Sequence, residues 1–348
     1  MALCYSRLAL PIIKRFAVLN TIRDVARIAG VSVATVSRVL NEPDKVAPKT
    51  QARVREVMTE LNFIPNLNAR SLATSRSGVI GILVNNVSGG YYARIVDSIE
   101  EEARRRNVFT LINCGNHDSD DVMQAALRLA SRQCDAIIAS VPFMDDDVLA
   151  RFLAMQPNAV LLNCISPLYR NRSLAVDNRY GVRLALDHLY QQGHRHIALV
   201  IGPLINSEVQ LRLAACREWF AERGLAEPAL VEGDFTAESG AKSAEQLLTR
   251  DNQLTALFCF NDHMAIGALH HARKAGLAIP AQLSVVGFDN NELAAYSEPG
   301  LTTVAQPLES LGEKALILAQ QLIAGEESGD QPLLLPELVI RHSTATPA

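Results

Sequence analysis

Small side chains and one arginine share a face of a short segment near the start of the chain. Val36 and Val39 follow helical spacing there, while Val33, Ala34 and Arg38 fall on the opposite face. An arginine can donate two hydrogen bonds to the edge of a guanine, and small apolar side chains can contact the methyl group of thymine. The spacing therefore fits a helix that reads base edges in a DNA major groove.

A second helical pattern precedes this segment. Residues 22–29 carry apolar side chains at helical spacing, and Gly30 then breaks the pattern. Thr21, with Asp24 three residues later, can cap the first helix, and Ser32 can cap the second. This predicts a helix, a tight turn and a helix. The pattern alone is only moderately specific, because a small apolar helical hairpin that binds no nucleic acid has the same periodicity.

Two polar side chains in the remainder of the chain stand near the carboxyl ends of apolar runs. Asn261 follows the run 256–260, and Asp289 follows the run 283–287. A sugar or similar small polar molecule needs planar, multidentate hydrogen-bond partners for its hydroxyls and an aromatic face for its C–H side. A lone Asp or Asn after a strand more commonly caps the next helix, so spacing alone favours a capping role for both residues.

The sequence lacks the motifs of common catalytic and metal sites. It contains no G-x-S-x-G, no G-x-G-x-x-G after a strand, no Walker loop and no H-E-x-x-H. His188, His194 and His196 fall at a predicted helix end and loop, where solvated or backbone-bonded histidines are usual. The six cysteines show no C-x-x-C pair and no metal-ligand spacing, so we expect buried thiols. We expect no enzyme activity, no cofactor and no metal.

Charge is distributed unevenly along the 348 residues. Residues 21–76 hold nine basic and five acidic side chains, whereas residues 77–348 hold 21 basic and 32 acidic ones. A basic head can meet DNA phosphates and an acidic body repels them, which orients the protein on DNA. No apolar run approaches the roughly 20 residues of a transmembrane helix, so we expect no membrane partner.

From Gly78 onward, short apolar runs alternate with amphipathic helical patterns. The runs are 79–84, 110–113, 136–139, 159–162, 197–201, 256–260 and 283–287. Such alternation predicts parallel sheets covered by helices, with ligands at the carboxyl ends of the strands. The predicted fold class is α/β: an N-terminal all-α helix-turn-helix head, then a core of two doubly wound parallel-sheet subdomains.

Longer stretches of the sequence resemble one known family. The wording DVAxxAGVSxATVSRVLN (24–41) is similar to the DNA-binding head of the LacI/GalR family of bacterial transcription regulators, and PNxxARSLAT (65–74) is similar to its hinge helix. In the body, GHRHIALVIGP, NDHMAIGAL, LSVVGFDN and LTTVAQP occur in the family's order and spacing. The resemblance covers about residues 20 to 344, and it implies a periplasmic-binding-protein-like core.

The resemblance also implies the domain boundaries. We expect an extension at 1–20, a helix-turn-helix domain at 21–66, a hinge helix at 67–77 and an effector-binding and dimerisation core at 78–348. The N-subdomain is expected at about 78–175 and 305–335, and the C-subdomain at about 176–304 and 336–348. Because family members usually begin close to the first helix, we expect translation to start near Val18 or Leu19.

Two sets of site residues follow from the family. The expected DNA-binding residues are Ser32, Val33, Ala34, Thr35, Ser37, Arg38 and Asn41 in the head and Asn66, Asn68, Arg70 and Leu72 in the hinge, with Leu72 as a wedge in the minor groove. The expected effector-binding residues are Tyr91, Tyr92, Asp177, Arg212, Phe235, Asn261 and Asp289. For the tyrosines the alternative is simple packing, and for Asp177 it is a helix cap. Asn290 stands where many relatives have a second Asp.

The resemblance implies a cytoplasmic, nucleoid-associated homodimer that binds a pseudo-palindromic double-stranded DNA operator. A sugar or sugar-derived inducer is expected to release it. A co-repressor that answers to a non-sugar metabolite is the first alternative. A pure sugar-binding protein is the second, although such a protein would carry neither the head nor the hinge.

Overall fold

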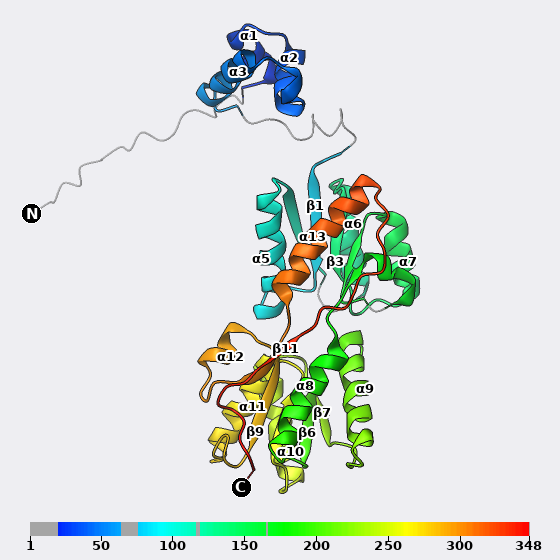
Figure 1. Cartoon of the computed structure of the whole chain (residues 1–348), viewed down its shortest axis with the longest axis vertical. Helices are drawn as coiled ribbons and strands as arrows, with labels where there is room; N and C mark the ends of the chain where they lie inside the picture. Colours follow the sequence, from blue (N-terminus) through cyan, green and yellow to red (C-terminus); the bar gives the residue numbers. More distant parts are fainter. Residues whose placement is uncertain (1–19, 64–75, 116–118, 165, 348) are drawn as a thin grey trace, which may run out of the picture. The chain divides into compact units, whose positions relative to one another are not determined.

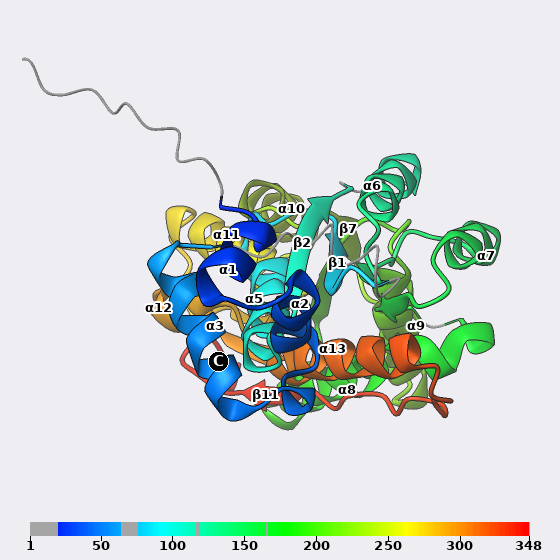
Figure 2. The ribbon, with the colours of Figure 1, turned by 90° about the horizontal axis from the view of Figure 1, so that it is seen from above.

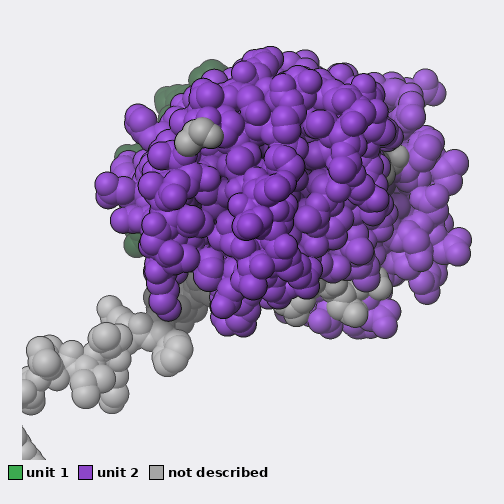
Figure 3. Space-filling model, turned by 90° about the horizontal axis from the view of Figure 1, so that it is seen from below, with its two compact units in different colours: residues 1–76 green, residues 77–348 purple. Residues whose placement is uncertain are grey.

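The computed structural model describes residues 20–63, 76–115, 119–164 and 166–347. Its contacts divide the chain into two compact units, Met1–Arg76 and Ser77–Ala348, which we call the head and the body (Figure 3). The extension at 1–19 lies outside the described residues. So do the four predicted hinge residues Asn66, Asn68, Arg70 and Leu72.

Three helices form the described part of the head: α1 (Ile22–Ala29), α2 (Val33–Asn41) and α3 (Pro48–Glu60), with a 3₁₀ turn at Pro43–Lys45. The Asp24 carboxylate accepts hydrogen bonds from the Thr21 backbone N–H (3.0 Å) and hydroxyl (2.7 Å), so the predicted cap of α1 is confirmed. Gly30 ends α1 with a left-handed φ of 68°. The Ser32 hydroxyl accepts from the Thr35 N–H at 3.1 Å, which confirms the cap of α2.

The head has a small core. It consists of the buried side chains Val25, Ala26, Ala29, Val36, Val39, Val54 and Val57. Valine and alanine bury little apolar area each, so the hydrophobic stabilisation of this unit is correspondingly small.

The N-subdomain of the body contains a five-stranded parallel sheet in the order β2-β1-β3-β4-β5. Its strands are β1 (Val79–Val84), β2 (Phe109–Cys114), β3 (Ala136–Ser140), β4 (Val160–Leu162) and β5 (Ser173–Leu174). Helices α5 (Gly90–Arg105) and α13 (Leu308–Ala324) cover one face. Helices α6 (Ser119–Ser131) and α7 (Asp146–Met155) cover the other (Figures 1 and 2).

The alternating side chains of β1 show why both faces need a cover. Ile80, Ile82 and Val84 pack under α5 and α13, whereas Leu83 packs under α6 and α7. Successive residues of a strand point to opposite faces, so a continuous apolar run gives a sheet that is buried on both sides.

The C-subdomain contains a six-stranded sheet in the order β11-β10-β9-β8-β6-β7. Its strands are β6 (Ile197–Ile201), β7 (Leu230–Glu232), β8 (Ala256–Cys259), β9 (Ser284–Asp289), β10 (Thr302–Ala305) and β11 (Glu337–Val339). Helix α8 (Asn178–Gln191) packs beside α9 (Ser207–Glu222), and α10 (Ala237–Arg250) beside α11 (Asp262–Lys274). A short helix, α12 (Glu292–Tyr296), follows β9. The strands are parallel except β11, which pairs antiparallel with β10.

Three segments connect the subdomains. The chain leaves the first sheet between β5 and α8, returns between β10 and α13, and leaves again between α13 and β11 (Figure 1). The first and third segments lie side by side, because Val176 pairs with Leu334 and the Asp177 N–H donates to the Leu334 carbonyl at 2.8 Å. This arrangement brings the carboxyl ends of strands from both sheets to one cavity.

The predicted α/β class, with a helical head and two doubly wound subdomains, is confirmed. Each of the seven predicted runs forms a strand, with bounds shifted by at most two residues. The short strands β5, β7, β10 and β11 were not among the predicted runs. Among the described helices, none has the length and apolar character needed to cross a membrane.

Candidate functional site

Helix α2 presents most of the predicted DNA-reading side chains on its solvent-facing side. Ser32, Val33, Ala34 and Arg38 are exposed, with 41% of Val33 accessible. Thr35 and Ser37 are half-buried, and Asn41 is the last residue of the helix. The apolar residues between them point into the core of the head, so the helix offers a row of short side chains and one long cation to a partner.

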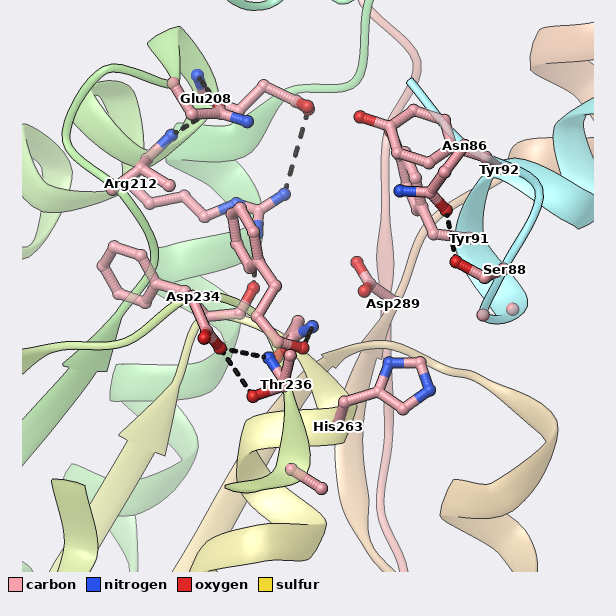
Figure 4. Close-up of a pocket in the computed structure, with 18 residues that line it drawn as sticks. Asn86, Ser88, Tyr91, Tyr92, Glu208, Arg212, Asp234, Thr236, His263 and Asp289 are labelled. Carbon is pink, nitrogen blue, oxygen red and sulfur yellow. Dashed lines mark hydrogen bonds and ion pairs between the residues drawn. The ribbon is translucent and has the colours of Figure 1, made fainter. Parts of the chain in front are cut away.

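A cavity of about 380 Å³ opens at the carboxyl ends of five strands, β1, β6, β7, β8 and β9, and is shown in Figure 4. Its lining residues are Asn86, Ser88, Gly89, Gly90, Tyr91, Tyr92, Asn206, Glu208, Val209, Arg212, Asp234, Phe235, Thr236, Ala237, Phe260, Asn261, His263 and Asp289. The N-subdomain supplies Asn86 and residues 88–92, and the C-subdomain supplies the others. The volume suits a small polar molecule such as a monosaccharide or disaccharide.

Arg212, from α9, is 4% exposed, and its guanidinium contacts several groups of the protein. Its Nε donates to Asn178 Oδ1 at 2.6 Å, and one terminal nitrogen donates to the Phe260 carbonyl at 2.5 Å. The guanidinium lies over the Phe288 ring at 3.7 Å from the ring centroid. These contacts fix the direction in which the remaining N–H groups point.

Asp289 ends β9 with an unusual left-handed φ of 108° and is 5% exposed. One carboxylate oxygen accepts from the Gln306 amide at 2.7 Å. Burial raises the pKa of Asp289 to about 7, although the nearby Arg212 charge opposes the shift. In Figure 4 its carboxyl group faces the cavity between Arg212 and His263. A strained backbone and a buried acid at the same position are typical of a binding site.

Glu208, in the first turn of α9, is a second buried acid in this wall. It is 6% exposed, and its Oε1 lies 3.8 Å from the Arg212 guanidinium and 3.5 Å from the Asn178 amide. Burial raises its pKa, and Arg212 only partly compensates. Its carboxyl group reaches across the cavity toward the tyrosines (Figure 4).

Tyr91 and Tyr92 form the N-subdomain wall. Their hydroxyls accept hydrogen bonds from the Asn163 amide (2.7 Å) and the Asn85 amide (2.6 Å). The two rings meet edge to face, with centroids 5.0 Å apart. Burial and the Glu208 charge raise the pKa of both phenols, which are therefore neutral hydrogen-bond donors at physiological pH.

The other three predicted effector residues differ in position. Asn261 lines the cavity and also caps α11, accepting from the Met264 N–H at 2.9 Å, so capping and lining coincide. Phe235, with a left-handed φ of 70°, lines the cavity and packs tightly against Gly202. Asp177 caps α8 by accepting from the Tyr180 N–H at 2.9 Å, and it does not line the cavity.

Several polar lining residues were missed by the sequence reasoning. They are Asn86, Ser88, Asn206, Glu208, Asp234, Thr236 and His263. Asn206 and Thr236 cap helices, and that local signal was available. Glu208 and His263 stand in first turns of helices, where a polar residue ordinarily faces solvent. Only the fold shows that Glu208 is buried and that His263 is half-buried against the cavity.

Comparison with known proteins gives matches to both units. The family model for bacterial regulatory proteins of the lacI family matches residues 21–66, and a periplasmic binding protein-like domain matches residues 186–344. The regulator GalR of Escherichia coli is 35% identical over 94% of this chain and 96% of its own length. The regulator GalS of Salmonella typhimurium is 38% identical over 93% and 96%.

Solved structures give the same result. A structure of the lac repressor dimer, bound to operator and the anti-inducer ONPF, superposes with a TM-score of 0.85 at 32% identity and covers 94% of this chain. A complex of the regulator CelR with cellobiose superposes with a TM-score of 0.70 at 28% identity and covers 93% of it.

Proposed function

The chain belongs to the lacI family of bacterial regulatory proteins, and on that premise we propose that it is a dimeric repressor that a sugar inducer releases from its operator. Two heads bind the half-sites of a pseudo-palindrome, and the ligand binds in the cavity of the body. The observation that carries the proposal is that one chain joins the exposed α2 face to a cavity with Arg212 and Asp289 buried in its wall.

The head supports the DNA-binding part. Arg38 is the candidate for guanine readout, and Val33 and Ala34 are candidates for thymine-methyl contacts. Ser32, Thr35, Ser37 and Asn41 would position the helix on phosphates, which contributes affinity rather than sequence choice. The hinge residues Asn66, Asn68, Arg70 and Leu72 remain proposals from the sequence, and the minor groove is their proposed target.

The cavity supports the sugar part. Asp289, Asn261 and Arg212 offer planar polar groups, and Phe235 offers an aromatic ring. Relatives whose structures hold a small molecule include the lac repressor, with the anti-inducer ONPF, and CelR, with cellobiose. The domain bounds predicted above remain part of the proposal, and the cytoplasm, at the nucleoid, is the proposed site of action.

The sign of the response separates an inducer from a co-repressor. An operator selected by repeated enrichment of random DNA on the full chain would be used in a mobility-shift titration with sugars that raise the Tm of the protein. We expect these sugars to weaken operator binding. Tighter operator binding would establish the co-repressor alternative. A sugar that is chemically altered on incubation would instead indicate that the protein is an enzyme.

A further inference from the structure

The charged side chains around the cavity restrict the net charge that a bound ligand can carry. Three carboxyl groups line it, from Glu208, Asp234 and Asp289, against one permanent cation, Arg212. We propose that the ligand is a sugar without negative charge, and that Glu208 and Asp289 together exclude phosphorylated and carboxylated sugars. This inference rests on the proposed function and specifies the ligand class of the same cavity.

The positive charge of Arg212 is already partnered by groups of the protein itself. Two of its nitrogens donate to Asn178 and to the Phe260 carbonyl, and the guanidinium is 3.8 Å from Glu208. A guanidinium held in this way stays beside its own carboxylate, so a phosphate that approached Arg212 would also approach Glu208. Arg212 can give a hydrogen bond to a ligand hydroxyl without providing a net positive site.

Among the described residues that line the cavity, Arg212 is the one Arg or Lys. Arg94 lies near Asp289, but it pairs with Glu309 at 2.7 Å and donates to the Asn290 carbonyl at 3.0 Å. His263 lines the cavity, and burial lowers its pKa, so the imidazole is neutral at physiological pH. Neither side chain therefore offsets the carboxylates for a ligand inside the cavity.

The helix N-termini at the cavity would ordinarily favour an anion. At α9, α10 and α11, side chains of the protein accept from N–H groups of the first turn, whereas α5, whose N-cap is Gly89, has no side-chain cap. Asn206 accepts from the N–H groups of Glu208 and Val209, Thr236 accepts from Ser239, and Asn261 accepts from Met264. Glu208 also places its own negative charge in the first turn of α9.

The wall offers a ligand donors, from the Tyr91 and Tyr92 hydroxyls and Arg212, and it offers acceptors from its carboxyl groups. Carboxylates accept and cannot donate, so they suit ligand hydroxyls, which carry protons. A sugar phosphate or a uronic acid would place a second negative charge against the ionised form of Glu208 or Asp289 in a buried wall. Because burial raises the pKa of Asp289 to about 7, this repulsion grows as the pH rises through that value. The neutral parent sugar would bind without that repulsion.

Matched pairs of ligands test the inference. The Tm of the full chain and the Kd from calorimetry would be measured with neutral hexoses, pentoses and disaccharides. Glucose and galactose would each be compared with their 6-phosphates and uronic acids. We expect at least one neutral sugar to raise the Tm, and within its series a Kd at least roughly 100-fold lower than that of the anionic members. An anionic member that binds more tightly than its neutral parent, or the failure of every neutral sugar, would overturn the inference.

The variant Glu208→Gln tests the role of the acid itself. It removes one charge at nearly constant shape, so we expect the neutral-to-anionic preference to fall by roughly 10-fold. Glu218→Gln on the same helix is the matched control, because Glu218 is exposed and pairs with Arg179, and it should leave the preference unchanged. If Glu208→Gln weakens both ligands equally, Glu208 is structural and the inference is wrong.

Failure of the inference can be told apart from failure of the proposed function. A sugar phosphate that releases the protein from its operator would leave the repressor intact and overturn the charge argument alone. Absence of any operator binding by the unliganded full chain would instead contradict the proposed function.

Discussion

The head and the body use charge in opposite ways. In the head, residues 21–76 carry an excess of basic side chains, and Arg38 is exposed on α2. In the body, Glu208, Arg212 and Asp289 are each at least 94% buried around one cavity. An exposed DNA-binding surface needs a partner of opposite charge, and a small core is enough to support it. A ligand-binding cavity must instead keep charged side chains buried away from water. The two kinds of recognition therefore have different energetic consequences.

The interiors of the two units differ accordingly. The seven buried core residues of the head are all Val or Ala, while the C-subdomain alone buries Trp219, Phe258, Phe260 and Phe288. The larger core of the body can offset the cost of its buried acids, whereas the head has little stability to lose.

The largest expected effect is on DNA binding. Arg38→Ala should weaken binding to the selected operator by roughly 100-fold, since a bidentate arginine–guanine contact discriminates by about 1–3 kcal/mol. Sugar affinity should stay unchanged, because the substitution lies in the other unit. Fluorescence anisotropy and calorimetry on the full chain measure the two affinities. Parallel loss of both would show that the head and the body are not separable as described.

The converse substitution lies in the cavity. Asp289→Ala should weaken binding of the inducing sugar by roughly 10- to 100-fold, because it removes a buried carboxyl group that can hydrogen-bond the sugar hydroxyls. Operator binding should persist and no longer respond to the sugar. A mobility-shift titration of the variant with increasing sugar is the check. If the sugar releases the variant from the operator as it does the original protein, Asp289 does not contact the ligand.

Sequence reasoning succeeded where periodicity was strong. The strands at Val79–Val84 and Ile197–Ile201 have the predicted bounds, since continuous apolar runs leave little choice. It missed β10, where buried Thr302 and Thr303 interrupt the apolar pattern, and β7, a three-residue edge strand. Short strands depend on pairing with distant neighbours, which local sequence does not reveal.

The cavity was harder to predict for a related reason. Asp177 and Asn261 stand in equivalent positions before helices and both form caps, yet only Asn261 also lines the cavity. Glu208 resembles an ordinary acid that stabilises a helix N-terminus, and only the packing of α9 shows that it is buried. Spacing predicts caps, whereas a binding role depends on which loops the fold brings together.

Matched core truncations should show the difference in stability between the two units. Val54 and Val286 are both fully buried, so each Val→Ala change should cost about 2 kcal/mol. In the head, this loss should raise hydrogen exchange across α1, α2 and α3 and weaken operator binding. In the body, Val286→Ala should lower the Tm without loss of the fold. Equal protection of the head in both variants would argue against its marginal stability.

The smallest expected effect concerns pH. Because the pKa of Asp289 rises from its ordinary value of 3.8 to about 7 in the folded state, the folded protein binds more protons between these values. This contribution therefore lowers the free energy of unfolding as pH rises from about 4 to 7. Asp289→Asn should reduce that dependence and stabilise the protein at pH 8 by at least about 1 kcal/mol, because the Asn amide carries no charge to bury. Denaturant unfolding at several pH values measures it, and an unchanged profile would contradict the assignment.

The central claim is that operator binding by the head and sugar binding by the body are coupled. The most direct test is whether each ligand changes the affinity for the other by the same factor. The Kd of the inducing sugar would be measured by calorimetry on the full chain, once free and once saturated with operator. We predict that the operator weakens sugar binding by the same factor by which the sugar weakens operator binding, typically about 5- to 150-fold. An identical sugar Kd with and without operator, or a tighter one with operator bound, would contradict it.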